Sequence, residues 1–278
     1  MIKIAITGAD GMVGSRIVEL LHGKLQFFAI PQTEMDITDK KKVRSVLNSI
    51  DFDFFLHLAA YTNVDAAEKN KEIAYKVNVL GTQNLYEVVS LKKKKMIYIS
   101  TGFVFDGENP PYSENSTPRP VSIYGETKYQ GEQFLSKDAM IVRFDYPYRN
   151  EFNLKKDFVR GIISALKEGK KLSMVTDSLI TPTFVDDIAK GLLFLIHNYS
   201  PEIYHLIGSN SISPYEAGIS IAKIYKLNTS LISGTSYSRY FMGKAKRPQF
   251  AKIISVKNTF TKMKSFEEGL KILYHNHL

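Results

Sequence analysis

The sequence predicts an α/β fold in which a doubly wound parallel sheet is followed by a smaller C-terminal lobe. Short apolar strand patterns alternate with helical patterns through the first half of the chain. Such alternation is typical of βαβ units, which place helices on both faces of a parallel sheet. After about Tyr146 the alternation becomes irregular, which predicts that a second part of the chain begins there.

The elements of the first half follow from local patterns. Ile2–Thr7 is a β-branched run and predicts a strand. Met12–Leu21 carries apolar residues at helical spacing and predicts a helix. The further strands expected here are Leu25–Ile30, Phe52–Ala60, Met96–Ser100 and Ala139–Phe144, and the further helices are Lys40–Ile50, Ile73–Leu91 and Lys128–Leu135.

The second half mixes shorter elements. Asp186 or Asp187 is the expected N-cap of a helix that runs to His197, since Asp is a favoured capping residue. The other helices expected here are Asp157–Glu168 and Pro214–Tyr225, and the strands are Lys171–Val175, Thr183–Val185 and Tyr204–Ile207.

Composition narrows the class of protein. The 278 residues carry a net charge of +9 and no cysteine, so disulfides, thiolate metal sites and cysteine nucleophiles are excluded. The lysines are scattered apart from Lys92–Lys95, so we expect no nucleic acid partner; a basic surface also suits a diphosphate-bearing small molecule. The apolar N-terminal run is too short for a membrane span, and we expect a cytoplasmic protein without a membrane partner.

A glycine-rich turn follows the first predicted strand. Thr7-Gly8-Ala9-Asp10-Gly11-Met12-Val13-Gly14 places glycines at three-residue intervals directly before a helix. Gly8 permits a tight turn, Gly11 lets the backbone approach a pyrophosphate, and Gly14 allows close packing of helix on strand. The free N–H groups at the helix start attract phosphate, so this turn predicts a dinucleotide site.

This N-terminal TGxxGxxG pattern resembles the extended short-chain dehydrogenases, a family with a Rossmann-like fold. The run HLAAYTNVDAAE also resembles the family segment after the third strand. The resemblance implies that a dinucleotide-binding domain covers 1–148, with returning elements at about 172–200, and that 149–278 is mainly a substrate-binding lobe. The cofactor-binding residues so expected are Gly8, Asp10, Gly11, Met12, Val13, Gly14, Asp36, Ile37, Ala59, Ala60, Tyr61, Tyr124 and Lys128.

The choice of cofactor stays open between NADP and NAD. An acid at the end of the second strand would bind a ribose 2′-hydroxyl and favour NAD, but that end reads Ile30-Pro31-Gln32. Arg16 is either a neighbour of a 2′-phosphate or a solvated helix residue. These residues slightly favour NADP, or an enzyme that accepts both cofactors.

Tyr124 and Lys128 form the expected catalytic pair. They are four residues apart, so on a helix they share a face. A nearby ammonium lowers the pKa of a phenol, which lets Tyr124 exchange a proton with a carbonyl or alcohol near neutral pH. Thr101 ends the preceding strand, where ligands gather in doubly wound sheets, and its hydroxyl is expected to bond the substrate oxygen.

The stretches STGFVFDG and YGETKYQGE resemble the dTDP-4-dehydrorhamnose reductase family, whose usual patterns are STDYVFDG and YGxxKxxGE. Arg143 followed by Tyr146 and Tyr148 resembles the family's RTSWVY, and Arg247-Pro248 also matches. The chain departs from the family at three places. Gly102 replaces an Asp, Phe144-Asp145-Tyr146-Pro147 replaces TSWV, and Ala251 stands where the family often has Ser after Arg-Pro.

The resemblance implies an NAD(P)-dependent oxidoreductase that reduces a nucleotide-linked 4-keto sugar, with dTDP-4-dehydro-L-rhamnose as the expected substrate. Thr101, Tyr124 and Lys128 are the expected catalytic residues, and Thr101, Gly102, Tyr146 and Arg247 the expected substrate-binding residues. We expect no metal ligand and, from base rates, a homodimer. Two alternatives stay open: a nucleotide-sugar epimerase, and a non-catalytic dinucleotide-binding subunit that resembles the β subunit of methionine adenosyltransferase.

Overall fold

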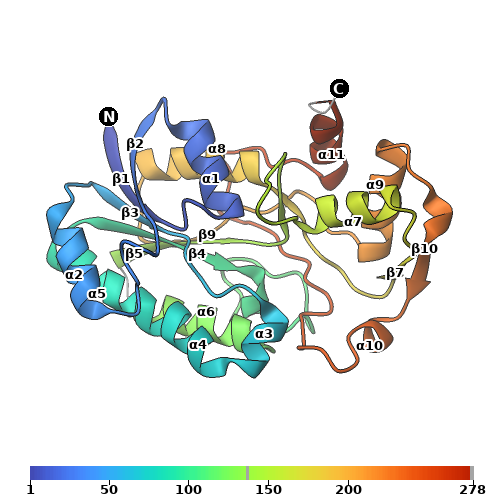
Figure 1. The fold of residues 1–278 in the computed structure, drawn as a ribbon, viewed down its shortest axis with the longest axis horizontal. Helices are drawn as coiled ribbons and strands as arrows, with labels where there is room; N and C mark the ends of the chain where they lie inside the picture. The colour runs from blue at the N-terminus through green and yellow to red at the C-terminus, as the bar shows by residue number, and fades with distance from the viewer. Residues whose placement is uncertain (136–137, 276–278) are drawn as a thin grey trace.

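The centre of the molecule is a sheet of six parallel strands, in the order β2-β1-β3-β4-β5-β9 (Figure 1). The computed structural model describes residues 1–135 and 138–275. The strands of this sheet are β1 (Ile2–Thr7), β2 (Leu25–Ile30), β3 (Phe54–His57), β4 (Lys95–Thr101), β5 (Ala139–Phe144) and β9 (Ile203–His205). The predicted doubly wound α/β class is confirmed.

Helices cover both faces of the sheet (Figure 1). One face carries α1 (Met12–Leu21) and α8 (Val185–His197), and its buried side chains include Ile4, Ile6 and Ile17. The other face carries α2 (Lys40–Ser49), α5 (Thr82–Leu91) and α6 (Ile123–Phe134). Because the strands are buried on both faces, they read in the sequence as continuous apolar runs instead of alternating ones.

The strand order reverses at β1. Since β2 pairs with one edge of β1 and β3 with the other, the loops after β1 and β3 diverge above the carboxyl ends of the strands. Such a switch point is where doubly wound sheets bind ligands. The short helices α3 (Val64–Lys69) and α4 (Lys71–Tyr75) follow β3 on this side.

The C-terminal lobe has its own small core, in which Tyr148, Phe184 and Phe266 meet. Its helices are α7 (Phe158–Lys167), α9 (Pro214–Ile224), α10 (Tyr237–Tyr240) and α11 (Phe266–His275). Its strands form two parallel pairs, β6 (Pro147–Tyr148) with β8 (Thr183–Phe184) and β7 (Leu172–Val175) with β10 (Ile232–Thr235). Of the elements expected to return to the main sheet at about 172–200, α8 packs on α1, whereas β7 belongs to the lobe. The domain limits at 148 and 149 stay a prediction.

Two local predictions were wrong. Neither Asp186 nor Asp187 caps α8, because the helix begins at Val185 and its N-cap is Phe184. Both carboxylates lie in the first turn and form ion pairs with basic side chains instead: Asp186 pairs with Arg16, and Asp187 with Lys264. The continuous helix expected over Ile73–Leu91 is α4 and α5 with a π-helical segment, Lys76–Gly81, between them.

In the part of the chain that the structure describes, no helix is both long and apolar enough to cross a membrane.

His57 predicts a pH dependence of stability. It is buried in β3, its Nδ1 lies 2.8 Å from Thr7 Oγ1 and its Nε2 lies 3.2 Å from Thr82 Oγ1. Burial and the charge of Lys128 lower its pKa from 6.5 to about 3. The unfolded chain therefore binds one more proton than the folded chain between these two values, so the free energy of unfolding falls as pH falls from about 6.5 towards 3.

The expected slope from this histidine is about 1.4 kcal/mol per pH unit. Urea unfolding at a series of pH values should show a shallower loss of stability for His57→Gln than for the wild type. His22→Gln, at an exposed position, is the matched control and should retain the wild-type slope. Equal slopes for all three proteins would contradict a buried neutral His57.

Candidate active site

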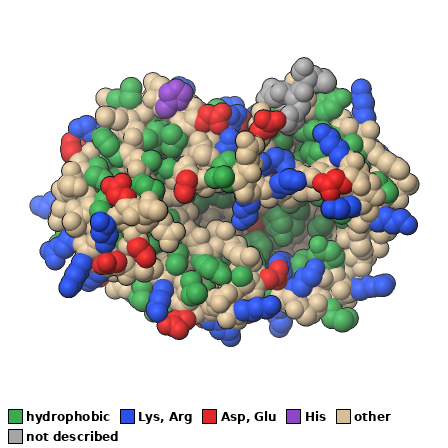
Figure 2. Space-filling view, viewed as in Figure 1, with side chains coloured by type: hydrophobic (Ala, Val, Ile, Leu, Met, Phe, Trp, Pro, Cys, Tyr) green, Lys and Arg blue, Asp and Glu red, His purple; other side chains and the backbone are tan. Residues whose placement is uncertain are grey.

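A cavity of about 1010 Å³ opens above the carboxyl ends of β1, β3, β4 and β5, between the sheet and the C-terminal lobe. Figure 2 shows a hollow near the middle of this face of the molecule, with basic side chains close to its edge. The cavity wall includes the glycine turn at one end and Thr101, Tyr124 and Lys128 at the other. A long ligand can therefore touch both groups at once.

The glycine turn is shaped by close backbone contacts. Gly8 has φ +72°, a left-handed conformation that glycine adopts without strain. A Cβ on Gly14 would lie only 2.1 Å from the carbonyl oxygen of Gly8, so α1 packs against the turn closer than any side chain allows. Gly11 is the N-cap of α1 and makes no side-chain cap, which leaves N–H groups of the first turn directed at the cavity.

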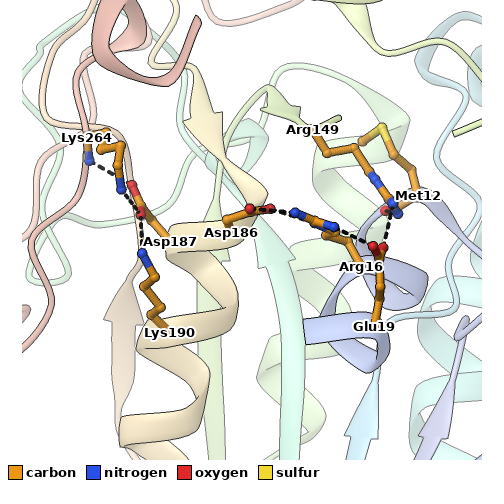
Figure 3. A network of polar contacts seen from close by, with 8 residues as sticks. All are labelled: Met12, Arg16, Glu19, Arg149, Asp186, Asp187, Lys190 and Lys264. Carbon is orange, nitrogen blue, oxygen red and sulfur yellow. Dashed lines mark hydrogen bonds and ion pairs between the residues drawn. The ribbon is translucent and has the colours of Figure 1, made fainter. Parts of the chain in front are cut away.

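A network of charges holds α1 in place (Figure 3). Arg16 donates from Nε and Nη2 to the two carboxylate oxygens of Asp186, both at 2.7 Å, and so ties α1 to α8. Arg149 donates to the carbonyl oxygen of Met12 at 3.1 Å and to Glu19 at 3.0 Å. The interpretation of Arg16 as a solvated residue was wrong, because its guanidinium is largely buried and pairs with Asp186. Its position beside a 2′-phosphate stays a prediction.

The expected cofactor residues after β2 and β3 also lie in the cavity wall. Ala59, Ala60 and Tyr61 follow β3, and Asp36 and Ile37 follow β2. Asn78 in the π-helical segment fixes this wall. Its Oδ1 accepts from the backbone N–H of Tyr61 at 2.7 Å, and its Nδ2 donates to the carbonyl of Tyr61 at 3.2 Å and to Thr127 at 3.0 Å. Asp36 also holds its own loop by accepting from the N–H and hydroxyl of Thr38.

Tyr124 and Lys128 point into the cavity from one face of α6, whose N-cap Ser122 accepts from the N–H of Gly125. The ammonium of Lys128 donates to the carbonyl of Ile99 at 2.8 Å and lies 4.0 Å from the centre of the Tyr98 ring. Burial lowers the pKa of Lys128 to about 7. Tyr124 shares a hydrogen bond with Thr101 at the end of β4, so the two hydroxyls can meet one substrate oxygen.

The pKa of Tyr124 differs from the expectation. Burial raises it to about 12, the hydrogen bond with Thr101 opposes this shift, and the charge of Asp145 adds to it. The predicted lowering by Lys128 was wrong for this structure, because desolvation of the phenol dominates. A raised pKa keeps Tyr124 protonated at neutral pH, which suits a group that gives a proton to a developing alkoxide.

Two expected substrate residues lie away from the cavity wall. Gly102 is buried behind Asp145 and Ile253. Arg247 donates to both carboxylate oxygens of Asp65, at 3.1 and 2.8 Å, and its guanidinium lies 4.8 Å from the centre of the Phe241 ring. The fourth, Tyr146, lines the cavity with Thr101.

The sequence analysis did not identify several residues of the wall. Phe103 lies between Tyr124 and Tyr146, with ring centres 5.6 and 6.0 Å away. Lys155 and Lys156 are exposed on the loop before α7 and supply positive charge. The sequence did contain a signal for this loop, because the two lysines directly precede Asp157, the N-cap of α7. Asp145 is the fourth such residue that we single out.

The chain resembles known proteins over nearly its whole length. Residues 2–277 match the family described as RmlD substrate binding domain. A dTDP-4-dehydrorhamnose reductase of Aggregatibacter actinomycetemcomitans is 32% identical over 233 residues, which are 80% of this chain and 78% of that protein.

Solved structures agree with this match. A dTDP-4-dehydrorhamnose reductase of Bacillus anthracis in complex with NADP is 32% identical, with a TM-score of 0.92 over 99% of this chain and all of that chain. A UDP-glucose 4-epimerase of Thermotoga maritima gives a TM-score of 0.83 over 99% of this chain and 98% of that chain, but at 18% identity it shows the shared fold alone.

Proposed function

The chain belongs to the RmlD substrate binding domain family, and on that premise we propose that it is an NAD(P)H-dependent reductase of a nucleotide-linked 4-keto sugar. We propose dTDP-4-dehydro-L-rhamnose as its substrate and dTDP-L-rhamnose as its product. Relatives named for this reaction, at about 32% identity, support the reaction class.

The observation that carries the proposal is the pairing of Tyr124 with Thr101 beside the buried Lys128, in the same cavity as the glycine turn. A phenol and a hydroxyl that can bind one oxygen, next to a dinucleotide cradle, fit the transfer of a hydride to a carbonyl. A subunit without catalytic activity would have no need of this arrangement.

The cradle itself fits a dinucleotide. The space beside Gly8 and Gly14 is so narrow that added Cβ atoms would meet backbone at 2.8 and 2.1 Å, so the turn can bring its own N–H groups against a pyrophosphate. No carboxylate stands at the end of β2, where Ile30 and Gln32 line the cavity, and this favours NADP over NAD. The complex of the Bacillus anthracis relative with NADP supports the same choice.

The chain's own residues account for the remaining chemistry. Bound reduced nicotinamide supplies the hydride. Thr101 and Tyr124 hold the ketone oxygen between their hydroxyls, and Tyr124 gives its proton to that oxygen as negative charge develops there. Lys128 places its ammonium at the base of the same site, where it can bind a ribose hydroxyl of the dinucleotide.

The basic loop before α7 suits the second half of the substrate. Lys155 and Lys156 lie in the cavity wall and remain exposed, so both can approach a diphosphate. Arg247, which is held by Asp65, stays a predicted contact for the nucleotide side. Location in the cytoplasm and assembly as a homodimer also stay predictions.

Turnover with purified components tests the proposal. Loss of the near-ultraviolet absorbance of reduced nicotinamide should require dTDP-4-dehydro-L-rhamnose, and should be faster with NADPH than with NADH. An epimerase would instead interconvert sugars without net consumption of the dinucleotide. Binding of the dinucleotide without turnover of this or any other 4-keto sugar nucleotide would favour a regulatory subunit.

A further inference from the structure

Asp145 carries a buried carboxyl group without a hydrogen-bond partner. It follows the last residue of β5, its side chain is almost fully enclosed with 1% exposed, and neither carboxylate oxygen accepts a hydrogen bond of good geometry, although the backbone N–H groups of Thr181 and Tyr146 lie nearby. An unpaired polar group in such a place costs about 1–3 kcal/mol, and more if it is charged. Natural proteins retain such a group where a ligand uses it.

The groups around Asp145 set the protonation state of its carboxyl and place it near the catalytic residues. The backbone N–H groups of Thr181 and Tyr146 lie near enough to favour the ionised form, but burial outweighs them and raises the pKa of Asp145 to about 7. Asp145 is one of the residues of the cavity wall, with Thr101 and Tyr124, and it is close enough to Tyr124 that its charge raises the pKa of that phenol.

The next residue is strained. Tyr146 has φ +39°, in the left-handed region that an aromatic residue rarely adopts. Strain of this kind costs about 1–3 kcal/mol and tends to occur at binding sites. Here it falls on the residue that follows Asp145 and lines the same cavity, so the backbone at the end of β5 is held in a shape that packing alone does not favour.

Asp145 also adjoins the place where the family pattern has an aspartate. β4 and β5 pair Thr101 with Phe144, so Gly102 and Asp145 are the next residues of the two strands. A Cβ on Gly102 would lie 3.2 Å from Cγ of Asp145. The family pattern has Asp at the position of Gly102 and Ser at the position of Asp145, so this chain carries one carboxyl in the same region, but on the neighbouring strand.

The two arrangements compete for space in this chain. A Cβ on Gly102 would also lie 2.0 Å from Cδ1 of Ile253, so the end of the isoleucine side chain would have to move to admit an aspartate at this position. Ile253 is buried with Val104 and Phe105 in a small apolar cluster. Ile253 and the carboxyl of Asp145 thus occupy the space around Gly102.

We propose that Asp145 determines sugar specificity by binding a ring hydroxyl of the sugar next to the carbonyl that is reduced, in place of the family aspartate that Gly102 lacks. This inference rests on the proposed function. The carboxylate of Asp145 accepts a hydrogen bond from that hydroxyl, while Thr101 and Tyr124 bind the carbonyl oxygen. The sugar is then held at two neighbouring positions.

The test compares the affinity of Asp145→Ser for dTDP-L-rhamnose and for dTDP, each measured by calorimetry. The variant should bind dTDP-L-rhamnose about 10- to 100-fold more weakly, which is the range for a hydrogen bond to a charged group, and should bind dTDP as the wild type does. Asp145→Asn, which retains the shape and one acceptor oxygen, should lose less. Asp53→Ser, at the amino end of β3 on the opposite edge of the sheet, is the control.

Thermal unfolding separates a binding role from a structural one. Because Asp145 is buried without a partner, Asp145→Ser should unfold at the wild-type temperature or above it. Unchanged affinity for the sugar nucleotide, or an equal loss for dTDP and dTDP-L-rhamnose together with a lower unfolding temperature, would overturn the inference. Failure of the wild type itself to bind dTDP-L-rhamnose would overturn the proposed substrate, and this inference with it.

Discussion

Tyr124→Phe is expected to lower kcat for ketone reduction by about 10²–10⁴-fold, the usual contribution of a positioned proton donor. The ring lines the cavity and packs edge-on against Phe103, and phenylalanine preserves that contact. Only the phenol hydroxyl, which is hydrogen-bonded to Thr101, is lost. The Kd for NADPH should therefore stay near the wild-type value, while steady-state turnover collapses.

Tyr129→Phe is the matched control. Tyr129 lies on the same helix but packs against the apolar cluster around Phe105, outside the cavity wall. It should leave kcat unchanged. A Tyr124→Phe variant that retains most of its activity would show that water or another group provides the proton.

Gly14→Ala should abolish dinucleotide binding. The added Cβ would lie 2.1 Å from the carbonyl oxygen and 2.9 Å from the carbonyl carbon of Gly8, and backbone atoms cannot move aside as a flexible side chain can. The turn must open or α1 must shift. We expect a loss of more than about tenfold in affinity for NADPH and a stability lower by about 1–3 kcal/mol.

Fluorescence titration with NADPH and urea unfolding measure the two effects. Gly161→Ala is the control, because no neighbouring atom approaches a Cβ at this position of α7. It should bind NADPH normally and be as stable as the wild type or slightly more so, since alanine favours helices. Normal binding by Gly14→Ala would contradict the role given to the glycine turn.

The strands and the glycine turn could be predicted because their determinants are local. β1, β2 and β5 have the predicted bounds, since each is a mostly apolar run with clear breaks on both sides. Short elements were missed where polar residues leave no periodic pattern of apolar side chains. α3 begins at Val64, after the capping side chain of Asn63, but its six residues are too few to show a periodic pattern.

Side-chain partners distant in sequence could not be predicted. Arg16 pairs with Asp186, 170 residues away, and Arg247 with Asp65, 182 residues away. The sequence left Arg16 open between a neighbour of a 2′-phosphate and a solvated residue, and the family resemblance implied a substrate contact for Arg247. The predicted direction of the shift in the pKa of Tyr124 was wrong for a related reason. The spacing to Lys128 shows which groups are near, whereas desolvation depends on everything that encloses the phenol.

The departures from the family pattern became informative only in three dimensions. Gly102 and Asp145 are 43 residues apart, but adjacent strands place them side by side. In the sequence they are two unrelated losses of a familiar motif. In the structure the two positions are neighbours, and this is why we infer that one carboxyl takes the place of the other.

The most direct test of the account is to follow the hydride. NADPH that carries deuterium at its transferable ring position should be incubated with the protein and dTDP-4-dehydro-L-rhamnose, and the product sugar analysed by mass spectrometry and proton NMR. The account predicts one deuterium at C4 of the product sugar, with label transfer strongly reduced in Tyr124→Phe. A product without label, or no reduced sugar despite bound NADPH, would contradict it.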